Sequence, residues 1–161
     1  MRIAVLKETA AGETRVAASP ETVKKFIALG ASVAVAAGAG EGASISDAEF
    51  VAAGAEVVKD AVKGADIVLG VQGPDLKTLK GANAGAWIVA GLDPFGQRKR
   101  VDEYAKAGFE ALAMEFMPRI TRAQSMDILS SQSNLAGYKA VIEAANAYGR
   151  AFPMMMTAAG T

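Results

Sequence analysis

Residues 19–36 read SPETVKKFIALGASVAVA and contain a helix, a glycine stop and a strand in direct succession. Ser19 is a favourable N-cap, and Pro20 suits the first helical position. The apolar side chains that follow recur at helical spacing: Val23, Phe26, Ile27 and Leu29. Gly30 ends the helix, and the short apolar run 32–36 predicts a buried strand.

The same succession recurs along the chain. Strands are predicted at 3–6, 32–36, 56–58, 66–71, 86–90 and 109–114, and further helices at 47–53 and 99–107. Continuous apolar runs are typical of strands buried on both faces, as in parallel sheets. The sequence therefore predicts an α/β fold with a doubly wound parallel sheet, flavodoxin-like or Rossmann-like, followed by a long connecting helix.

The pattern changes in the last third. Residues 115–130 are polar and irregular, and 131–150 read as one long helix whose apolar face is Leu135, Tyr138, Ile142 and Ala145. No charge follows Arg150, which is unusual for a solvated terminus. We expect residues 1–130 to form one domain, and 131–161 to be a helix and connection leading toward a further domain.

Composition excludes several kinds of chemistry. The 161 residues include 17 basic and 17 acidic ones, no cysteine and no histidine. Disulfides, thiolate metal sites and histidine-based catalysis are therefore impossible, and no metal site is predicted. The basic run Arg98-Lys99-Arg100 is expected to be a solvated helix start, without nucleic-acid binding. We see neither a signal peptide nor a membrane span, and expect a cytoplasmic location.

Polar residues follow several predicted strands at the sheet edge where ligands bind in open parallel sheets. Lys7 and Arg15 could hold an anion there or belong to a solvated loop. Gln72 and Asp93 follow later strands and could line a cleft or serve turns. The glycines of 38–42 are spaced wrongly for a dinucleotide fingerprint, which favours a plain turn.

The segment from Arg119 to Ser133 gathers Arg, Gln, Asp and Ser side chains in a chain that is otherwise mostly apolar. Arg119 offers a planar fork of donors, and Gln124 can donate and accept hydrogen bonds, as an amide-bearing ligand requires. Asp127 can orient Arg119 or accept a ribose hydroxyl, and Ser130 can cap the long helix or contact the ligand. A capping loop with an internal Arg–Asp pair explains the same residues.

A family resemblance rests on this segment. Residues 122–138 read RAQSMDILSSQSNLAGY, with MPRI at 117–120 and FPMMMTAAGT at 152–161. Together they closely resemble the α subunit of proton-translocating NAD(P) transhydrogenase. The start of the chain, with RIAVLKE at 2–8 and ETRVA at 13–17, resembles the N-terminal domain that this family shares with alanine dehydrogenase.

The resemblance implies an NAD(H)-binding subunit of a Re/Si-specific enzyme complex that passes hydride from NADH to NADP⁺. A partner domain would hold NADP(H), and a separate membrane part would carry the coupled protons. It further implies nicotinamide and ribose contacts from Arg119, Gln124, Ser125, Met126, Asp127 and Ser130. Among these residues, Gln124 and Asp127 would act at the reaction itself.

The resemblance also implies a homodimer, peripheral to the inner membrane through its complex and without a span of its own. The family continues past the position of Thr161 into a dinucleotide-binding domain with a glycine fingerprint. We therefore expect an incomplete site, and no hydride transfer, in this chain alone.

Two alternatives remain open at the level of sequence. An alanine dehydrogenase-like oxidoreductase would, by family resemblance, use a lysine where Gln72 stands and a histidine near Leu92 and Asp93, and both are absent. A non-catalytic assembly or dimerisation module would instead use the apolar helix 131–150 and the uncharged tail as a docking surface.

Overall fold

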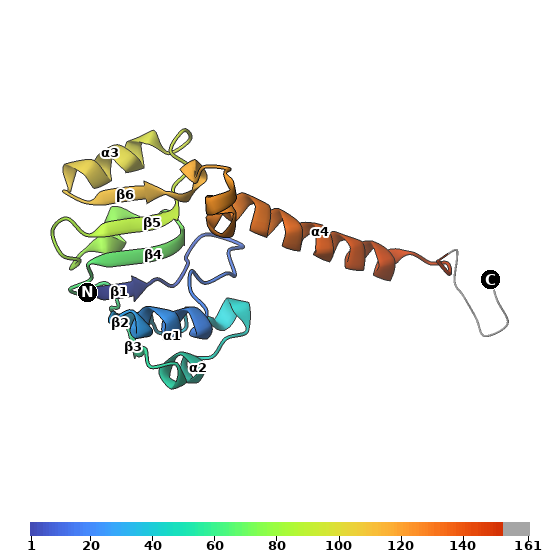
Figure 1. The fold of residues 1–161 in the computed structure, drawn as a ribbon, viewed down its shortest axis with the longest axis horizontal. Helices are drawn as coiled ribbons and strands as arrows, with labels where there is room; N and C mark the ends of the chain where they lie inside the picture. Colours follow the sequence, from blue (N-terminus) through green and yellow to red (C-terminus); the bar gives the residue numbers. More distant parts are fainter. Residues whose placement is uncertain (153–161) are drawn as a thin grey trace. The chain divides into compact units, whose positions relative to one another are not determined.

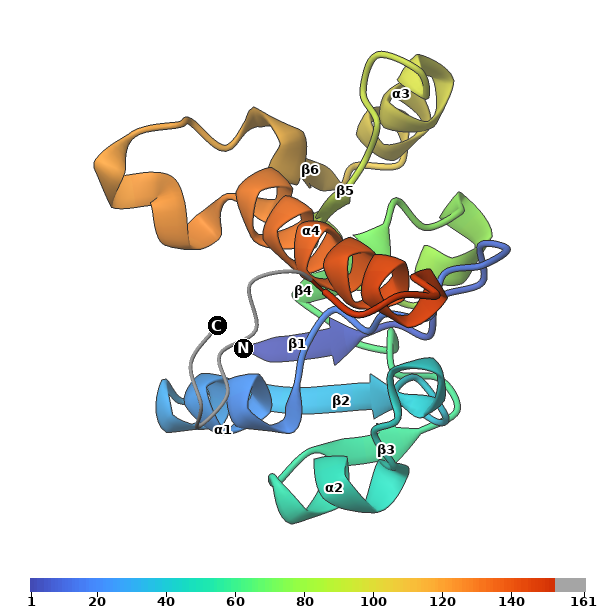
Figure 2. The ribbon, with the colours of Figure 1, turned by 90° about the vertical axis from the view of Figure 1, so that its right-hand side faces the viewer.

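The computed structural model describes residues 1–152 (Figures 1 and 2). The chain divides into a compact unit, Met1–Met117, and a second unit that begins at Pro118. The predicted division after residue 130 stays a prediction.

Within residues 1–152, six strands form one parallel sheet in the order β3-β2-β1-β4-β5-β6. They are β1 (Arg2–Val5), β2 (Ser32–Ala36), β3 (Glu56–Val58), β4 (Ile67–Gln72), β5 (Trp87–Gly91) and β6 (Glu110–Ala113). The order reverses between β1 and β4, the topological switch point of a doubly wound fold. The predicted fold class is confirmed, and each observed strand lies within one residue of its predicted limits.

Helices lie against both faces of the sheet. They are α1 (Pro20–Ala28), α2 (Asp47–Ala52), α3 (Arg98–Lys106) and the short 3₁₀ helices η1 (Glu41–Ala43), η2 (Leu76–Leu79) and η3 (Met114–Phe116). In Figure 1, α1 and α2 accompany the β1–β3 half of the sheet and α3 accompanies the β5–β6 half. The Ser19 hydroxyl caps α1 by accepting a hydrogen bond from Thr22 N at 3.2 Å, as the sequence predicts.

The strands alternate their side chains between two cores. Ile3 and Val5 of β1 belong to the core that contains Phe50 of α2. Ala4, the residue between them, belongs to the opposite core, which contains Tyr104 of α3. Because side chains alternate along a strand, β1 is buried on both faces, which explains its uninterrupted apolar sequence.

The second unit contains the 3₁₀ helix η4 (Thr121–Met126) and the long helix α4 (Ile128–Ala147). α4 begins three residues before its predicted start because Asp127, rather than Ser130, is its N-cap. The apolar face predicted for this helix is largely exposed: Leu135 is 58%, Tyr138 67% and Ile142 42% exposed. The rest of the predicted connection, 153–161, lies outside the described residues.

Two side chains of α3 bind the loop that follows β4. Arg100 Nη1 donates to the Gly73 carbonyl oxygen at 2.6 Å, and the Tyr104 hydroxyl donates to the Pro74 carbonyl. The expectation that Arg98-Lys99-Arg100 is a solvated run therefore holds for Arg98 and Lys99 and is wrong for Arg100. Its long side chain folds back toward the sheet because Gly73 offers an unpaired carbonyl there.

Burial raises the pKa of Tyr104 to about 12. The pKa of Tyr104 in the folded state therefore lies above the unfolded value near 10. The contribution of this tyrosine to the free energy of unfolding is complete below pH 10 and is lost as pH rises toward 12. Between pH 9 and pH 11 we expect the unfolding free energy of the wild type to fall by about 1.4 kcal/mol more than that of Tyr104→Phe. Urea unfolding of both proteins measures this. Tyr138→Phe, which changes an exposed tyrosine, should show the same fall of unfolding free energy with pH as the wild type. An identical dependence on pH in all three proteins would contradict the prediction.

Candidate functional site

The loop after β1 is joined to the end of β4 across the switch point. The pairing of β1 with β4 ends at Val5 and Leu69, so the last residues of β4 extend beyond their neighbour strand. Glu8 accepts hydrogen bonds from Val71 N at 2.6 Å and from Gln72 N at 3.3 Å. One carboxylate thus satisfies two strand-end amides and fixes the first loop against the central strands.

A second carboxylate organises the same loop. Glu13 accepts hydrogen bonds from Arg15 Nε at 2.7 Å and Arg15 Nη2 at 2.6 Å, and from Gln72 Nε2 at 3.0 Å. The Glu13 side chain is only 8% exposed. The Arg15 guanidinium, with a smaller contribution from Gln72, lowers the pKa of Glu13 to about 2, so this carboxylate is ionised at neutral pH.

The cations predicted to hold an anion are both paired with carboxylates. Arg15 binds Glu13, and Lys7 Nζ lies 3.1 Å from Glu41 Oε2. A cavity of about 190 Å³ lies between these two pairs, and a second of about 320 Å³ lies on the Gln72 side of the loop. These hollows are the crevice that a doubly wound sheet offers at its switch point, and carboxylates line both of them beside the cations.

The glycines of 38–42 permit close packing of this loop. A Cβ on Gly42 would lie 2.8 Å from the Thr14 carbonyl oxygen, and a Cβ on Gly40 would lie 2.6 Å from the Ile45 carbonyl oxygen. The Gly38 N–H donates to Asp47, at 2.9 Å to Oδ1. The amide that a phosphate-binding loop would aim at its ligand is therefore already bound, which agrees with the predicted plain turn.

The turn after β5 is held in the same way as the end of β4. Glu115, which follows β6, accepts hydrogen bonds from Leu92 N at 3.1 Å and Asp93 N at 2.7 Å. Asp93 has a left-handed backbone with φ of 47°, and its Oδ1 accepts from Gly96 N at 3.2 Å. Asp93 therefore serves the turn, one of its two predicted uses.

In the second unit, Asp127 organises the predicted ligand-binding segment. Its Oδ1 accepts from Leu129 N at 2.9 Å and Ser130 N at 3.3 Å, and its Oδ2 accepts from the Ser130 hydroxyl at 2.6 Å. These bonds from Ser130 and Leu129, with a smaller contribution from the Arg119 charge, lower the pKa of Asp127. Hydrogen bonds thus join Asp127 to Ser130, and the positive charge of Arg119 interacts with the Asp127 carboxylate.

The other predicted residues of this segment lie on or beside η4. Arg119, Gln124, Ser125 and Met126 are exposed, whereas Ala123 on the same turn is 2% exposed. Within residues 1–152, the side chain of Gln124 makes no hydrogen bond. Its amide is therefore free to bind another molecule.

Sequence reasoning missed the carboxylates that hold the loops at the carboxyl edge of the sheet, Glu8, Glu13 and Glu115. Each contacts residues far away in the chain, such as Glu8 and Val71, 63 positions apart. The available signal was positional: Glu8 and Glu115 stand within two residues of the ends of predicted strands, where a sheet edge leaves unpaired amides.

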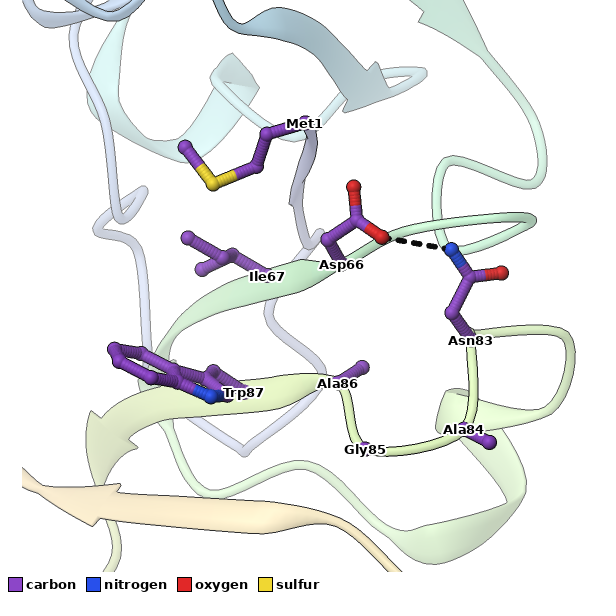
Figure 3. A pocket seen from close by; sticks show the side chains of 8 residues that line it. All are labelled: Met1, Asp66, Ile67, Asn83, Ala84, Gly85, Ala86 and Trp87. Carbon is purple, nitrogen blue, oxygen red and sulfur yellow. Dashed lines mark hydrogen bonds between the residues drawn. The ribbon is translucent and has the colours of Figure 1, made fainter.

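A separate pocket of about 240 Å³ lies at the opposite, amino-terminal edge of β4 and β5 (Figure 3). Trp87, 50% exposed, and Met1 supply its apolar walls. Asp66 Oδ1 accepts from Asn83 Nδ2 at 2.8 Å, and its Oδ2 accepts from Arg2 N at 2.7 Å. The polar groups of this pocket therefore bind one another and the start of β1.

The described residues contain no cluster of acidic side chains that could hold a metal ion. No helix in the same stretch of the chain is both long and apolar enough to cross a membrane.

The close approach of two loops makes Gly42 sensitive to substitution. We expect Gly42→Ala to lower the free energy of unfolding by about 1–3 kcal/mol, because a Cβ would press on the Thr14 backbone. Gly137→Ala is the control, since a Cβ there meets no atom within 4 Å, and it should leave stability unchanged or raise it slightly. Denaturant unfolding compares the two, and equal stabilities would contradict the loop contact.

The lowered pKa of Glu13 gives an acid-side prediction. Its folded-state pKa of about 2 lies below the ordinary 4.5, so its stabilising contribution is complete above pH 4.5 and is lost as pH falls toward 2. The thermal midpoint of the wild type should fall more steeply across this window than that of Glu13→Gln. Glu110→Gln, at an exposed position of β6, should follow the wild type. A Glu13→Gln variant with the wild-type pH profile would argue against the Glu13–Arg15 pairing.

Comparison with known proteins agrees with these features. The chain is 51% identical over its entire length to an NAD(P) transhydrogenase subunit alpha polypeptide of Rhodospirillum rubrum, of which it covers 44%. A transhydrogenase structure from Sinorhizobium meliloti superposes with a TM-score of 0.89 at 52% identity, covering 99% of this chain and 48% of that one. An L-alanine dehydrogenase structure is more distant, with a TM-score of 0.69 at 27% identity over 77% of this chain and 35% of that one.

The chain thus spans about half the length of the relatives it matches or less. It is more similar to transhydrogenase α subunits than to alanine dehydrogenases, which confirms the resemblance seen in the sequence. The family model "Alanine dehydrogenase/PNT, N-terminal domain" matches residues 4–136, most of the chain. The chain therefore belongs to the family of alanine dehydrogenase and transhydrogenase N-terminal domains.

Proposed function

We propose that this chain forms the first portion of the NAD(H)-binding subunit of a proton-translocating, Re/Si-specific transhydrogenase. In this function hydride passes from NADH to NADP⁺ on a partner domain. The observation that carries the proposal is the arrangement of residues 119–130, in which Arg119 and Gln124 lie exposed beside the helix start built by Asp127. Relatives named as transhydrogenase α subunits cover the whole chain, this segment included.

The residues of this segment fit the nicotinamide end of NAD(H). A carboxamide needs both an acceptor and a donor, and the free amide of Gln124 supplies both. The Arg119 guanidinium adds donors in a fixed fork. Asp127 accepts three hydrogen bonds from Leu129 and Ser130, so about one of the four lone pairs of its carboxylate is left to accept a ribose hydroxyl.

The cofactor supplies the hydride chemistry, and this chain supplies binding and orientation. Gln124 and Asp127 hold the nicotinamide and ribose in the geometry for transfer. Ser130 fixes the Asp127 carboxylate through its hydroxyl. Exposed Ser125 and Met126 lie on η4 beside Gln124 and supply further contacts. Such positioning accelerates transfer because the reacting groups are aligned before reaction.

The remaining components of the site belong, in this proposal, to other segments. Residues 1–130 form the first domain, and 131–161 lead toward a dinucleotide-binding domain that holds the rest of NAD(H). The exposed apolar side chains of α4 support this, because the apolar face of a helix is normally covered by another element. We further propose a homodimer on the cytoplasmic face of the inner membrane, bound through NADP(H)-binding and membrane partners.

A non-catalytic assembly module is the second candidate, and the exposure of Leu135, Tyr138 and Ile142 favours it. An amino- or keto-acid dehydrogenase is disfavoured, because the cations that could hold a substrate carboxylate are already paired: Arg15 with Glu13 and Lys7 with Glu41. The Gln72 side chain also donates to Glu13.

The test compares this chain with one extended through a following dinucleotide-binding domain. Calorimetric titration should show NADH binding to the extended chain and weak or no binding to the 161 residues alone. Failure of the extended chain to bind NADH would refute the transhydrogenase proposal and leave the assembly module.

In the extended chain we expect Gln124→Ala and Arg119→Ala to slow hydride transfer to NADP⁺ by roughly 100-fold, with a much smaller loss of NADH affinity. The reason is that these side chains position the ring more than they hold the whole cofactor. Stopped-flow transfer and calorimetry measure the two quantities. Asn146→Ala and Arg150→Ala, exposed on or just after α4, are the matched controls. Equal losses of affinity and rate would show binding without a positioning role.

A further inference from the structure

A groove of about 430 Å³ lies between η2 and the end of α3, away from the crevice at the carboxyl edge of the sheet. Its apolar lining comes from η2 and from the loops before β5 and β6: Leu76, Leu79, Ala82, Ala107 and Phe109. Leu79 is 1% exposed and belongs to the core that contains Tyr104, so the floor of the groove rests on packed core. A concave site of this volume with a mainly apolar lining is typical of small-molecule binding.

Three lysines without acidic partners surround this groove. Lys77 and Lys80 line it, and both are exposed. Lys63 is adjacent, because a Cβ on Gly81 would lie 3.6 Å from the Lys63 Cα. Within residues 1–152, none of these three lysines takes part in an ion pair. Like charges on neighbouring loops repel one another, so a bound anion would relieve that repulsion.

The acidic residues nearest in sequence are directed elsewhere. Asp75 lines the crevice at the carboxyl edge, and Asp66 lines the pocket of Figure 3. Glu110 directly follows Phe109, and because side chains alternate along a strand it faces the side of the sheet opposite the groove. Lys106, in the last turn of α3, offsets the negative end of that helix. The groove therefore combines an apolar floor with a net positive rim.

We propose that this groove binds an anionic amphiphile, an acyl chain that ends in a carboxylate or phosphate group. The chain lies on Leu79 and Phe109, and its anionic end meets Lys77 and Lys80. The stem of a lysine is apolar and its ammonium is a compact charge, so one side chain can cover the acyl chain and pair with the anion. A free acid and an anionic lipid share this chemistry. The site goes beyond the proposed hydride transfer and does not rest on it.

The test is calorimetric titration of the 161-residue chain with dodecanoate, kept below the concentration at which it forms micelles. Lys77→Gln with Lys80→Gln should weaken binding by about tenfold or more. Ala107→Trp, which places a large ring in the groove from an exposed position, should weaken it as well. Lys24→Gln with Lys25→Gln on α1 removes the same charge from two exposed positions and should bind as the wild type does. Circular dichroism confirms that each variant is folded.

Two further probes separate the acyl chain from its charge. Acetate has the anionic group without the chain, and dodecyltrimethylammonium has the chain with a positive group, so neither should bind. Binding of the cationic amphiphile as tight as that of dodecanoate would overturn the proposal, because the lysines would then contribute nothing. Wild-type affinity for dodecanoate in both the lysine variant and Ala107→Trp would overturn it too, since the ligand would then bind elsewhere.

Vesicles distinguish the two sources of such a ligand. Sedimentation compares vesicles of phosphatidylcholine and phosphatidylglycerol in equal parts with vesicles of phosphatidylcholine alone. Binding to the anionic vesicles that the lysine variant loses would assign the site to a membrane lipid, and binding of dodecanoate alone would assign it to a free acid. If the wild type binds neither dodecanoate nor anionic vesicles, the groove is not an amphiphile site, and the proposed transhydrogenase function stands unchanged.

Discussion

The bond between Glu8 and the end of β4 is the contact on which the carboxyl edge of this fold depends. The strand order reverses between β1 and β4, so the loops of these two strands diverge and leave a crevice. Glu8 joins them at 2.6 Å from Val71 N, and Glu13 adds the bond from Gln72. The crevice therefore has fixed walls, and Gln72 is held by one carboxylate through its backbone and by another through its side chain.

Local signals in the sequence predicted the elements well, because their causes are local. Ser19 and Pro20 start α1, and the strands at 32–36 and 56–58 have the limits that their apolar runs indicate. The start of α4 was missed because Asp127 and Ser130 are both acceptable caps. The sequence does not show that the Asp127 carboxylate binds two amides and the Ser130 hydroxyl together.

Contacts between distant residues could not be predicted in the same way. Arg100 belongs to a basic run that is typical of solvated helix starts, yet it binds Gly73, 27 positions away. Lys7 suggested an anion site, yet it lies beside Glu41 on another loop. In both examples the residue type indicated a polar role, but the bonding partner could not be predicted from the sequence, because it depends on the strand order. The free amide of Gln124 is different, since its use depends on a molecule outside this chain.

The titratable groups also bear on the proposed function. Among the described residues, hydrogen bonds lower the pKa of Glu13, Glu49, Asp66 and Asp127 and raise that of Arg15, and burial raises that of Tyr104. All six shifts lead away from neutrality, whereas a general acid or base works best with a pKa near the working pH. These groups therefore keep one protonation state and act as fixed hydrogen-bonding partners. A chain built in this way suits a reaction in which the cofactor carries the chemistry and the protein sets the geometry.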